Sequence, residues 1–249
     1  MNELWAIVVA LPHERQAILP QLSVRAQVRG HGFKIWEGEI AQRKVLLVQS
    51  GLGVTSARRA GSFLIEHFPI THLIATGYCG ALQASLKTAD AVWANALQME
   101  GEELSILNEE ESLKISVEKS LKACSQPYQR GVLLTRHNAV NRVEDKKTLA
   151  TSAGATAVDM ETYPLFQASK TSSQKIAFLS LRFVLDAAGD ELAPTEDFVG
   201  QNGQVKALHL AKQILKRPPL VLELQGMGHK AAQAREALSA WVKCFFKNL

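Results

Sequence analysis

The sequence predicts a single α/β domain of three layers, in which helices cover both faces of a mixed, mostly parallel, twisted central sheet. Its 249 residues are 47% apolar and 21% charged, which is typical of a soluble globular chain with one large core. Strand and helix patterns alternate through most of the chain, as they do in proteins with parallel sheets. No internal repeat, low-complexity tract or linker divides this alternation.

The first strand is expected over Leu4–Leu11, a nearly continuous apolar run of the kind found in strands covered on both faces. The run is too short for a signal peptide and lacks a basic leader, and no segment approaches the ~20 apolar residues of a membrane span. Pro12 fits the first turn of the helix that follows through Leu19. Glu14 therefore lies beyond the end of a central strand. It is either a candidate acid or base, or an acidic residue that compensates the helix dipole.

Two glycine-containing segments follow buried-type strands. Ser50–Gly53 comes after a strand at Lys44–Gln49 and opens a helix. Two glycines before a helix let backbone N–H groups approach an anion or a hydroxyl, although a tight turn is the more frequent explanation. Thr76–Leu82 comes after the strand Thr71–Ala75 and again places small residues at a strand end.

Shorter patterns predict the elements of the middle of the chain. Residues 100–111 contain six acidic residues and predict a solvated loop and the start of a helix. Their carboxylates lack the order of an EF-hand and therefore do not predict a metal site. Arg136–Asn141 leaves the end of a strand. Further strands are expected at 24–28, 33–36, 90–94 and 131–135, and further helices at 113–123 and after Val143.

A strand-to-helix junction places two carboxylates and a methionine together. The β-type run Ala155–Val158 gives way to a helical pattern that begins at Thr162. Between them lie Asp159, Met160 and Glu161. Because ligands of open α/β sheets bind beyond the carboxyl ends of strands, this junction is a candidate binding site. Stabilisation of the helix dipole by acidic residues explains the same pattern equally well.

The strand expected over Lys175–Asp186 contains one charged residue and ends at another. Arg182 lies within the apolar run and Asp186 closes it. An unpaired charge in a buried strand would be costly, so we expect these residues either to serve function or to pair with each other.

The C-terminal region is expected to extend a main domain that spans residues 1–216. Residues 217–249 begin with Arg217 and a proline pair and continue into an amphipathic helix at Ala231–Phe246. From Lys206 onward eight basic residues accompany two acidic ones, although the net charge of the chain is only +4. A solvated basic face is the more frequent explanation, and contact with an anionic surface is the alternative. The helix is expected to pack on the body through Ala234, Leu238, Trp241, Val242 and Phe245.

Cysteine usage and charge pattern limit the cofactors, partners and compartment. Cys79, Cys124 and Cys244 are odd in number and widely spaced, which predicts neither a disulfide framework nor a zinc site. We expect no metal or organic cofactor and a reducing, cytoplasmic location. Nucleic acid is not an expected partner, because the basic residues are not interleaved with aromatic ones.

Five segments, taken together, resemble the purine nucleoside and uridine phosphorylase superfamily, and most of all its 5′-methylthioadenosine/S-adenosylhomocysteine nucleosidase branch. The resemblance extends from about Leu4 to Lys216, and the segments occur in the order of the family. No single segment is decisive, whereas five in register are a strong signal. They are Ala10–Glu14, Ser50–Gly53, Thr76–Gly80, Val158–Glu161 and Arg182–Asp186.

The resemblance implies a role for individual residues. Asp186 would be the general acid at N7 of the leaving purine, Glu14 would activate the attacking water, and Arg182 would help to place it. A protonated Asp186 near neutral pH requires a pKa well above ~3.9, and hence burial or a nearby negative charge. The implied substrate-binding residues are Glu161 on the ribose hydroxyls, Met160 on the sugar, Ala139 and Val140 at the base, and Asp159, Gly51, Gly77 and Tyr78.

The choice between water and phosphate depends on an anion site. In the phosphorylase branch an arginine precedes the second glycine segment, and this chain has Ala75 there. The first loop carries Glu14 in place of the phosphate-binding glycine and arginine. Both differences favour water as the nucleophile.

Two residues depart from the nucleosidase pattern. Tyr78 stands where a small hydroxyl residue is usual, and Leu185 stands where serine is usual before the aspartate. The long tail is similar to that of hopanoid-associated members of the superfamily. This resemblance implies adenosylhopane as the substrate. A lipid-borne substrate would allow the basic tail to rest on anionic headgroups at the inner face of the membrane.

Three functions therefore remain open. The first is cleavage of the N-ribosidic bond of a 5′-substituted adenosine, with release of adenine. The second is a hopanoid-linked nucleosidase or phosphorylase, and the third is a noncatalytic module that binds a nucleoside or a membrane surface. The resemblance also implies a homodimer.

Overall fold

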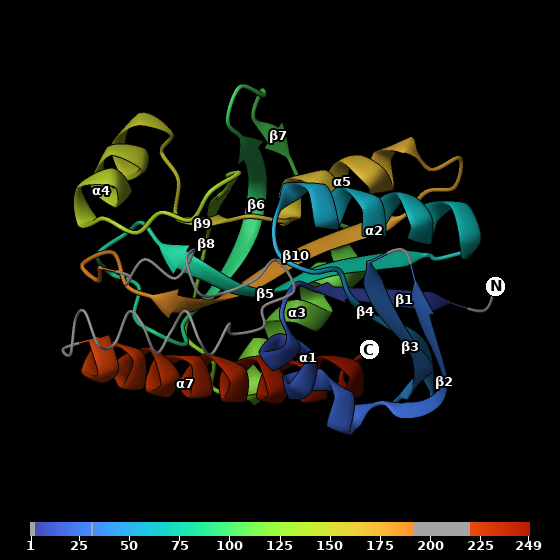
Figure 1. Cartoon of the computed structure of the whole chain (residues 1–249). Coiled ribbons are helices and arrows are strands. Elements are labelled where there is room, and N and C mark those ends of the chain that lie inside the picture. The colour runs from blue at the N-terminus through green and yellow to red at the C-terminus, as the bar shows by residue number, and fades with distance from the viewer. Residues whose placement is uncertain (1–2, 31, 192–219) are drawn as a thin grey trace.

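A ten-stranded mixed sheet forms the middle of the molecule (Figure 1). The structure is a computed structural model, and it describes residues 3–30, 32–191 and 220–249. The strands are β1 Leu4–Val9, β2 Ser23–Gly30, β3 Phe33–Ile40, β4 Arg43–Gln49, β5 His72–Ala81, β6 Ala91–Met99, β7 Ser105–Ile106, β8 Tyr128–Thr135, β9 Ala157–Asp159 and β10 Ala177–Asp186. The helices are α1 Pro12–Ile18, α2 Val54–His67, α3 Glu111–Ala123, α4 Val143–Ser152, α5 Thr162–Thr171 and α7 Leu220–Lys247, with a 3₁₀ turn at Leu19–Gln21.

The helices cover both faces of the sheet, which confirms the predicted three-layer α/β/α architecture. Figure 1 shows α2 and α5 on one face and α1, α3 and α7 on the other. Strand β1 illustrates why the sheet is covered twice: Ala6 and Val8 belong to the core on the first side, whereas Ile7 and Val9 belong to the core on the second. Successive side chains of a strand point to opposite faces, so an unbroken apolar run needs a cover on each.

The sheet is mixed, and one part of it closes on itself. Parallel pairs join β4 to β1, β1 to β5, and β5 to β10. Strand β10 then pairs antiparallel with β6, which leads through β8 and β9 back to β5. Strands β5, β10, β6, β8 and β9 thus form a ring. Strand β9 runs antiparallel to β5 and pairs Val158 with Gly80 and Ala157 with Ala81, so it lies beside the carboxyl end of β5.

One expectation about local structure was wrong, and a second fails at a single residue. Thr76–Leu82 was expected to leave the strand, yet β5 continues to Ala81, so these small residues lie within the sheet. The acidic residues 100–111 were expected to be solvated, and of the six only Glu109 is buried. Glu109 accepts hydrogen bonds from Trp93 Nε1 at 2.6 Å and Arg130 Nη2 at 2.7 Å. A guanidinium partner and an indole donor offset the cost of burying that carboxylate.

Helix α7 packs on the body through its apolar face, as the pattern predicts. Leu238, Trp241 and Phe245 are fully buried in the core between the sheet and helices α1 and α3. Trp241 Nε1 also donates to Ser120 Oγ of α3 at 3.1 Å. The helix begins at Leu220, earlier than expected. The expected boundary at 216/217 and the basic residues from Lys206 to Arg217 lie outside the described residues.

Candidate active site

Residues from six separate segments line a cavity of about 140 Å³ at the edge of the ring. The segments follow β1 and β4, lie within β5, follow β8 and β9, and end β10. Both apolar residues and carboxylates line it. The lining residues are Ala10, Leu11, Glu14, Leu52, Tyr78, Cys79, Gly80, Asn138, Ala139, Val140, Val158, Asp159, Met160, Glu161, Leu185 and Asp186.

Glu14 is held at the cavity by backbone N–H groups from two segments. Its Oε2 accepts from Ala10 N at 2.8 Å and Leu11 N at 2.7 Å, and its Oε1 accepts from Tyr78 N at 2.7 Å. Each carboxylate oxygen can accept about two hydrogen bonds, so Oε1 retains one acceptor position. Burial raises the pKa of Glu14, while Arg182 and the three N–H groups oppose the rise.

Gly77 is the residue that lets Glu14 lie against strand β5. Its φ is +130°, in a region that residues with a side chain rarely adopt. A Cβ at this position would collide with Glu14 Oε1 and would approach Glu14 Cδ to 2.7 Å. Because Gly77 has no side chain, it leaves room for the Glu14 carboxylate. It does not itself line the cavity.

Arg182 lies beneath the cavity at the centre of the buried charges. Its guanidinium pairs with Asp159 Oδ2 at 2.9 Å and Glu161 Oε2 at 3.5 Å, and it donates to Thr162 Oγ1 at 2.9 Å. Although burial lowers the pKa of Arg182, the carboxylates of Asp159, Glu161 and Glu14 raise it above its ordinary value. The expected alternative of an ion pair with Asp186 is therefore not realised.

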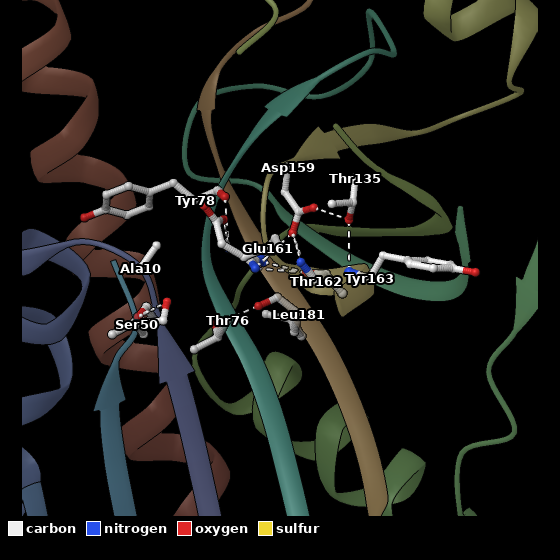
Figure 2. A network of polar contacts seen from close by, with 12 residues as sticks. Ala10, Ser50, Thr76, Tyr78, Thr135, Asp159, Glu161, Thr162, Tyr163 and Leu181 are labelled. Carbon is white, nitrogen blue, oxygen red and sulfur yellow. Dashed lines mark hydrogen bonds and ion pairs between the residues drawn. The ribbon is translucent and has the colours of Figure 1, made fainter. Parts of the chain in front are cut away.

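Asp159 is satisfied on both oxygens by protein groups (Figure 2). Thr135 Oγ1 donates to its Oδ1 at 2.6 Å, while the Thr162 N–H donates to Oδ2 at 3.1 Å, beside Arg182. Thr135 Oγ1 in turn accepts from the N–H of Tyr163 at 3.0 Å. This network joins the end of β8, the end of β9 and the first turn of α5, so it fixes the junction that carries Met160 and Glu161.

Glu161 faces the cavity with one oxygen bound to the glycine loop. Its Oε1 accepts from the N–H of Gly53 at 2.8 Å, and Gly53 has φ +90°. Burial raises the pKa of Glu161 to about 7, against the opposing effect of Arg182. The first glycine segment thus acts through Gly53 on Glu161, while Leu52 lines the cavity and Gly51 does not.

Asp186 ends β10 and meets a partner that the sequence pattern did not indicate. Lys146 of α4 is fully buried, and its Nζ contacts Asp186 Oδ2 in a hydrogen-bonded ion pair. Burial raises the pKa of Asp186, and the Lys146 ammonium group opposes the rise. The direction agrees with the shift expected for a general acid, and its main cause is burial.

The structure brings most of the predicted site residues to one cavity. Of the predicted set, only Arg182, Gly51 and Gly77 do not line it. Several residues were missed because their roles depend on partners far along the chain. Asn138 was within a quoted segment, whereas Lys146 gave no signal, since it lies in an ordinary polar helix pattern. The missed residues are Ala10, Leu11, Leu52, Cys79, Gly80, Thr135, Asn138, Lys146, Val158 and Thr162.

The chemistry available to the cavity is that of carboxylates in an apolar surround. Four acidic residues line it, and no lysine or arginine does so among the residues that the structure describes. Glu14 keeps a free acceptor position for a proton, and Asp186 is a buried carboxyl with a raised pKa. Two carboxyl groups in different environments suit acid and base roles in the cleavage of a glycosidic bond.

Curated proteins similar to this chain are nucleosidases. The 5′-methylthioadenosine/S-adenosylhomocysteine nucleosidase of Colwellia psychrerythraea is 25% identical over 221 residues, covering 80% of this chain and 90% of the relative. The protein of the same name from Staphylococcus haemolyticus is 25% identical over 213 residues, covering 78% of this chain and 92% of the relative.

Solved structures with the same fold cover the whole chain. Futalosine hydrolase of Helicobacter pylori gives a TM-score of 0.78 at 16% identity, with 100% of this chain and 99% of that chain covered. The nucleosidase of Colwellia psychrerythraea in complex with adenine gives 0.77 at 20% identity, with 100% and 96% covered. A family model of the phosphorylase superfamily matches residues 5–217, a range that contains every residue lining the cavity. The chain therefore belongs to the phosphorylase superfamily.

Proposed function

We propose that the protein hydrolyses the N-ribosidic bond of a 5′-substituted adenosine and releases adenine. The observation that carries the proposal is that Glu14 and Asp186 line one cavity with Glu161, each held by a different set of partners. The similarity to methylthioadenosine/S-adenosylhomocysteine nucleosidases along most of the chain supports the same substrate class.

In the proposed reaction, water attacks C1′ while the C1′–N9 bond breaks and its electron pair moves into the purine. Glu14 accepts the proton of the water at its free position, and Asp186 donates a proton to N7. Glu161 holds the ribose hydroxyls and Met160 packs on the sugar. Opposite protonation states of two carboxyl groups are what an oxocarbenium-like transition state requires.

The charge of the cavity favours water over phosphate. A phosphate dianion needs cations or several N–H donors around it. The described residues that line the cavity include Glu14, Asp159, Glu161 and Asp186 but no lysine or arginine. Ala75 lies buried in β5, where the phosphorylase branch has an arginine. We therefore assign the nucleophile as water.

The apolar residues that line the cavity suit the thioether or alkyl portion of a 5′ substituent. Leu11, Leu52, Tyr78 and Leu185 line it together with Met160. Among the described residues the Tyr78 hydroxyl has no hydrogen-bond partner, although it is buried. A thioether or alkyl group would bury apolar surface here, at about 25 cal/mol per Å².

Adenine release tests the proposal. We expect release from methylthioadenosine, S-adenosylhomocysteine or a 5′-alkyl adenosine without phosphate, and we expect Asp186→Asn to lower kcat at least about 100-fold, as removal of a general acid does. Asp145→Asn, an exposed aspartate of α4, is the matched control and should leave release unchanged. Release that requires phosphate would overturn the hydrolytic assignment. Release from none of the three substrates would remove the adenosine assignment itself.

Assembly and membrane contact remain predictions of the sequence. We propose a homodimer, to be measured by light scattering. No helix among the described residues is long and apolar enough to cross a membrane. Because α7 buries its apolar face, peripheral contact with a membrane would use exposed basic residues such as Lys243 and Lys247. Sedimentation with vesicles measures this binding.

A further inference from the structure

Lys146 is a buried lysine that the reaction described above does not use. It lies on α4, its side chain is 0% exposed, and it does not line the cavity. Its Nζ donates to Asp186 Oδ2, to Ala187 O at 2.9 Å and to Asp190 O at 2.9 Å. An ammonium group has three N–H donors, so all three are used. Burying a lysine is costly unless it is paired, and here the pairing is complete.

The turn after β10 is shaped around this ammonium group. The Asp190 N–H donates to Ala187 O at 3.0 Å, and the Ala187 N–H donates to Asp190 Oδ2 at 2.7 Å. The turn therefore presents two carbonyl oxygens and the Asp186 carboxylate to one point. Since Asp186 lines the cavity and Lys146 lies behind it, the lysine fixes the orientation of that carboxyl group from the protein side.

Resting on the proposed function, we propose that Lys146 is a positioning residue that acts through Asp186. Its ammonium group stabilises the carboxylate that remains when Asp186 gives its proton to the departing base. One proton moves from the Asp186 carboxyl group to the purine, the C1′–N9 electron pair is neutralised, and Lys146 keeps its own three protons. Lys146 thereby strengthens the acid at the moment of transfer without touching the substrate.

The charged groups around Asp186 determine how the loss of Lys146 would change the pKa of Asp186. The groups that face it are Lys146 on α4, Asp190 in the turn, Lys230 on α7 and Cys79 on β5. Burial raises the pKa of Asp186, whereas Lys146 lowers it by charge and by hydrogen bond. Without Lys146 the carboxyl group would be a weaker acid. Its proton would then be lost at a higher pH, and its transfer to the base would be slower.

Replacement of Lys146 by methionine tests this. We expect Lys146→Met to lower kcat about 10-fold or more, with a smaller change in KM, and to move the alkaline limb of the pH profile of kcat/KM upward by at least about one unit. Lys146→Arg keeps the charge, so its alkaline limb should lie at the wild-type position. The matched control is Lys147→Met, an exposed neighbour on the same helix, which should change neither. A limb that stays in place or moves downward in Lys146→Met would overturn the proposal.

A second measurement separates this inference from the proposed function. The ¹³C resonance of the Asp186 carboxyl group, assigned with Asp186→Asn, gives its pKa without substrate. We expect a higher pKa of Asp186 in Lys146→Met than in the wild type. An equal or lower pKa would reject the proposed effect of Lys146 on Asp186. If the pKa of Asp186 is higher in Lys146→Met than in the wild type while the wild type releases no adenine, the effect of Lys146 on Asp186 is supported and the proposed function is rejected. If Lys146→Met does not fold, Lys146→Gln, which retains N–H donors for the turn, replaces it in both measurements.

Discussion

At the scale of single residues, the cavity depends on carboxylates whose partners differ. Glu14 is held by neutral N–H groups, Asp159 by hydroxyls and a guanidinium, and Asp186 by an ammonium group. An isolated buried carboxylate would take up a proton, so the choice of partner decides which of them is a base, an anchor or an acid. The residue types alone, read from the sequence, did not reveal these partners.

Gly77 provides the first prediction at this scale. Gly77→Ala should lower kcat/KM at least about 10-fold, because a misplaced catalytic group is that costly, and should reduce stability by about 1–3 kcal/mol through backbone strain. The reason is that the new Cβ would displace Glu14. Steady-state kinetics and urea unfolding measure the two effects.

Gly101→Ala is the matched control for that substitution. Gly101 also has a positive φ, of +84°, but a Cβ there meets nothing within 4 Å. Its alanine variant should show comparable strain and unchanged kinetics. Equal kinetics in the two variants would mean that contact between Gly77 and Glu14 does not position the carboxylate.

At the scale of elements, α7 contacts the turn that carries Asp186. Lys230 Nζ pairs with Asp190 Oδ2 at 2.6 Å, and the same oxygen accepts from the Ala187 N–H. Helix α7 also contributes Trp241 and its neighbours to the core. The C-terminal helix is thus attached both to the body of the domain and to its catalytic turn, which its amphipathic pattern alone did not indicate.

Loss of the Lys230–Asp190 pair should affect catalysis more than stability. We expect Lys230→Met to lower kcat/KM several-fold, because the turn around Lys146 loosens, while the free energy of unfolding falls by at most about 1 kcal/mol, as for other partly exposed ion pairs. Lys243→Met, exposed on the same helix, is the control. If both variants keep wild-type kinetics, the turn does not depend on α7.

At the scale of the whole molecule, the sequence predicted the layers but not the closure of the sheet. Periodicity identifies strands and their covered faces, as at Leu4–Val9, yet it does not state which strands pair or in which direction. The ring depends on β9, a strand of three residues that bridges β8 and β5. The ion pair of Lys146 with Asp186 spans 40 positions in sequence and was missed for the same reason.

The buried carboxylates predict how the stability of the whole molecule depends on pH. Glu161 has its pKa raised from 4.5 to about 7 in the folded state, and the pKa values of Glu14 and Asp186 are raised too. A raised pKa contributes stability that is fully present below the unfolded-state value and is lost as pH rises through the folded-state value. The free energy of unfolding should therefore fall between about pH 4.5 and pH 7 on account of Glu161.

Glu161→Gln isolates the contribution of Glu161, because glutamine keeps an acceptor for the Gly53 N–H but does not titrate. We expect the fall in unfolding free energy from pH 5 to pH 8 to be smaller in this variant by about 2 kcal/mol, since each pKa unit corresponds to about 1.4 kcal/mol and part of the fall already occurs below pH 5. Urea unfolding at the two pH values measures it. Glu118→Gln, an exposed glutamate of α3, should follow the wild type. If Glu161→Gln follows the wild type as well, Glu161 is ionised throughout this range and the buried charge beside Arg182 is stable as an anion.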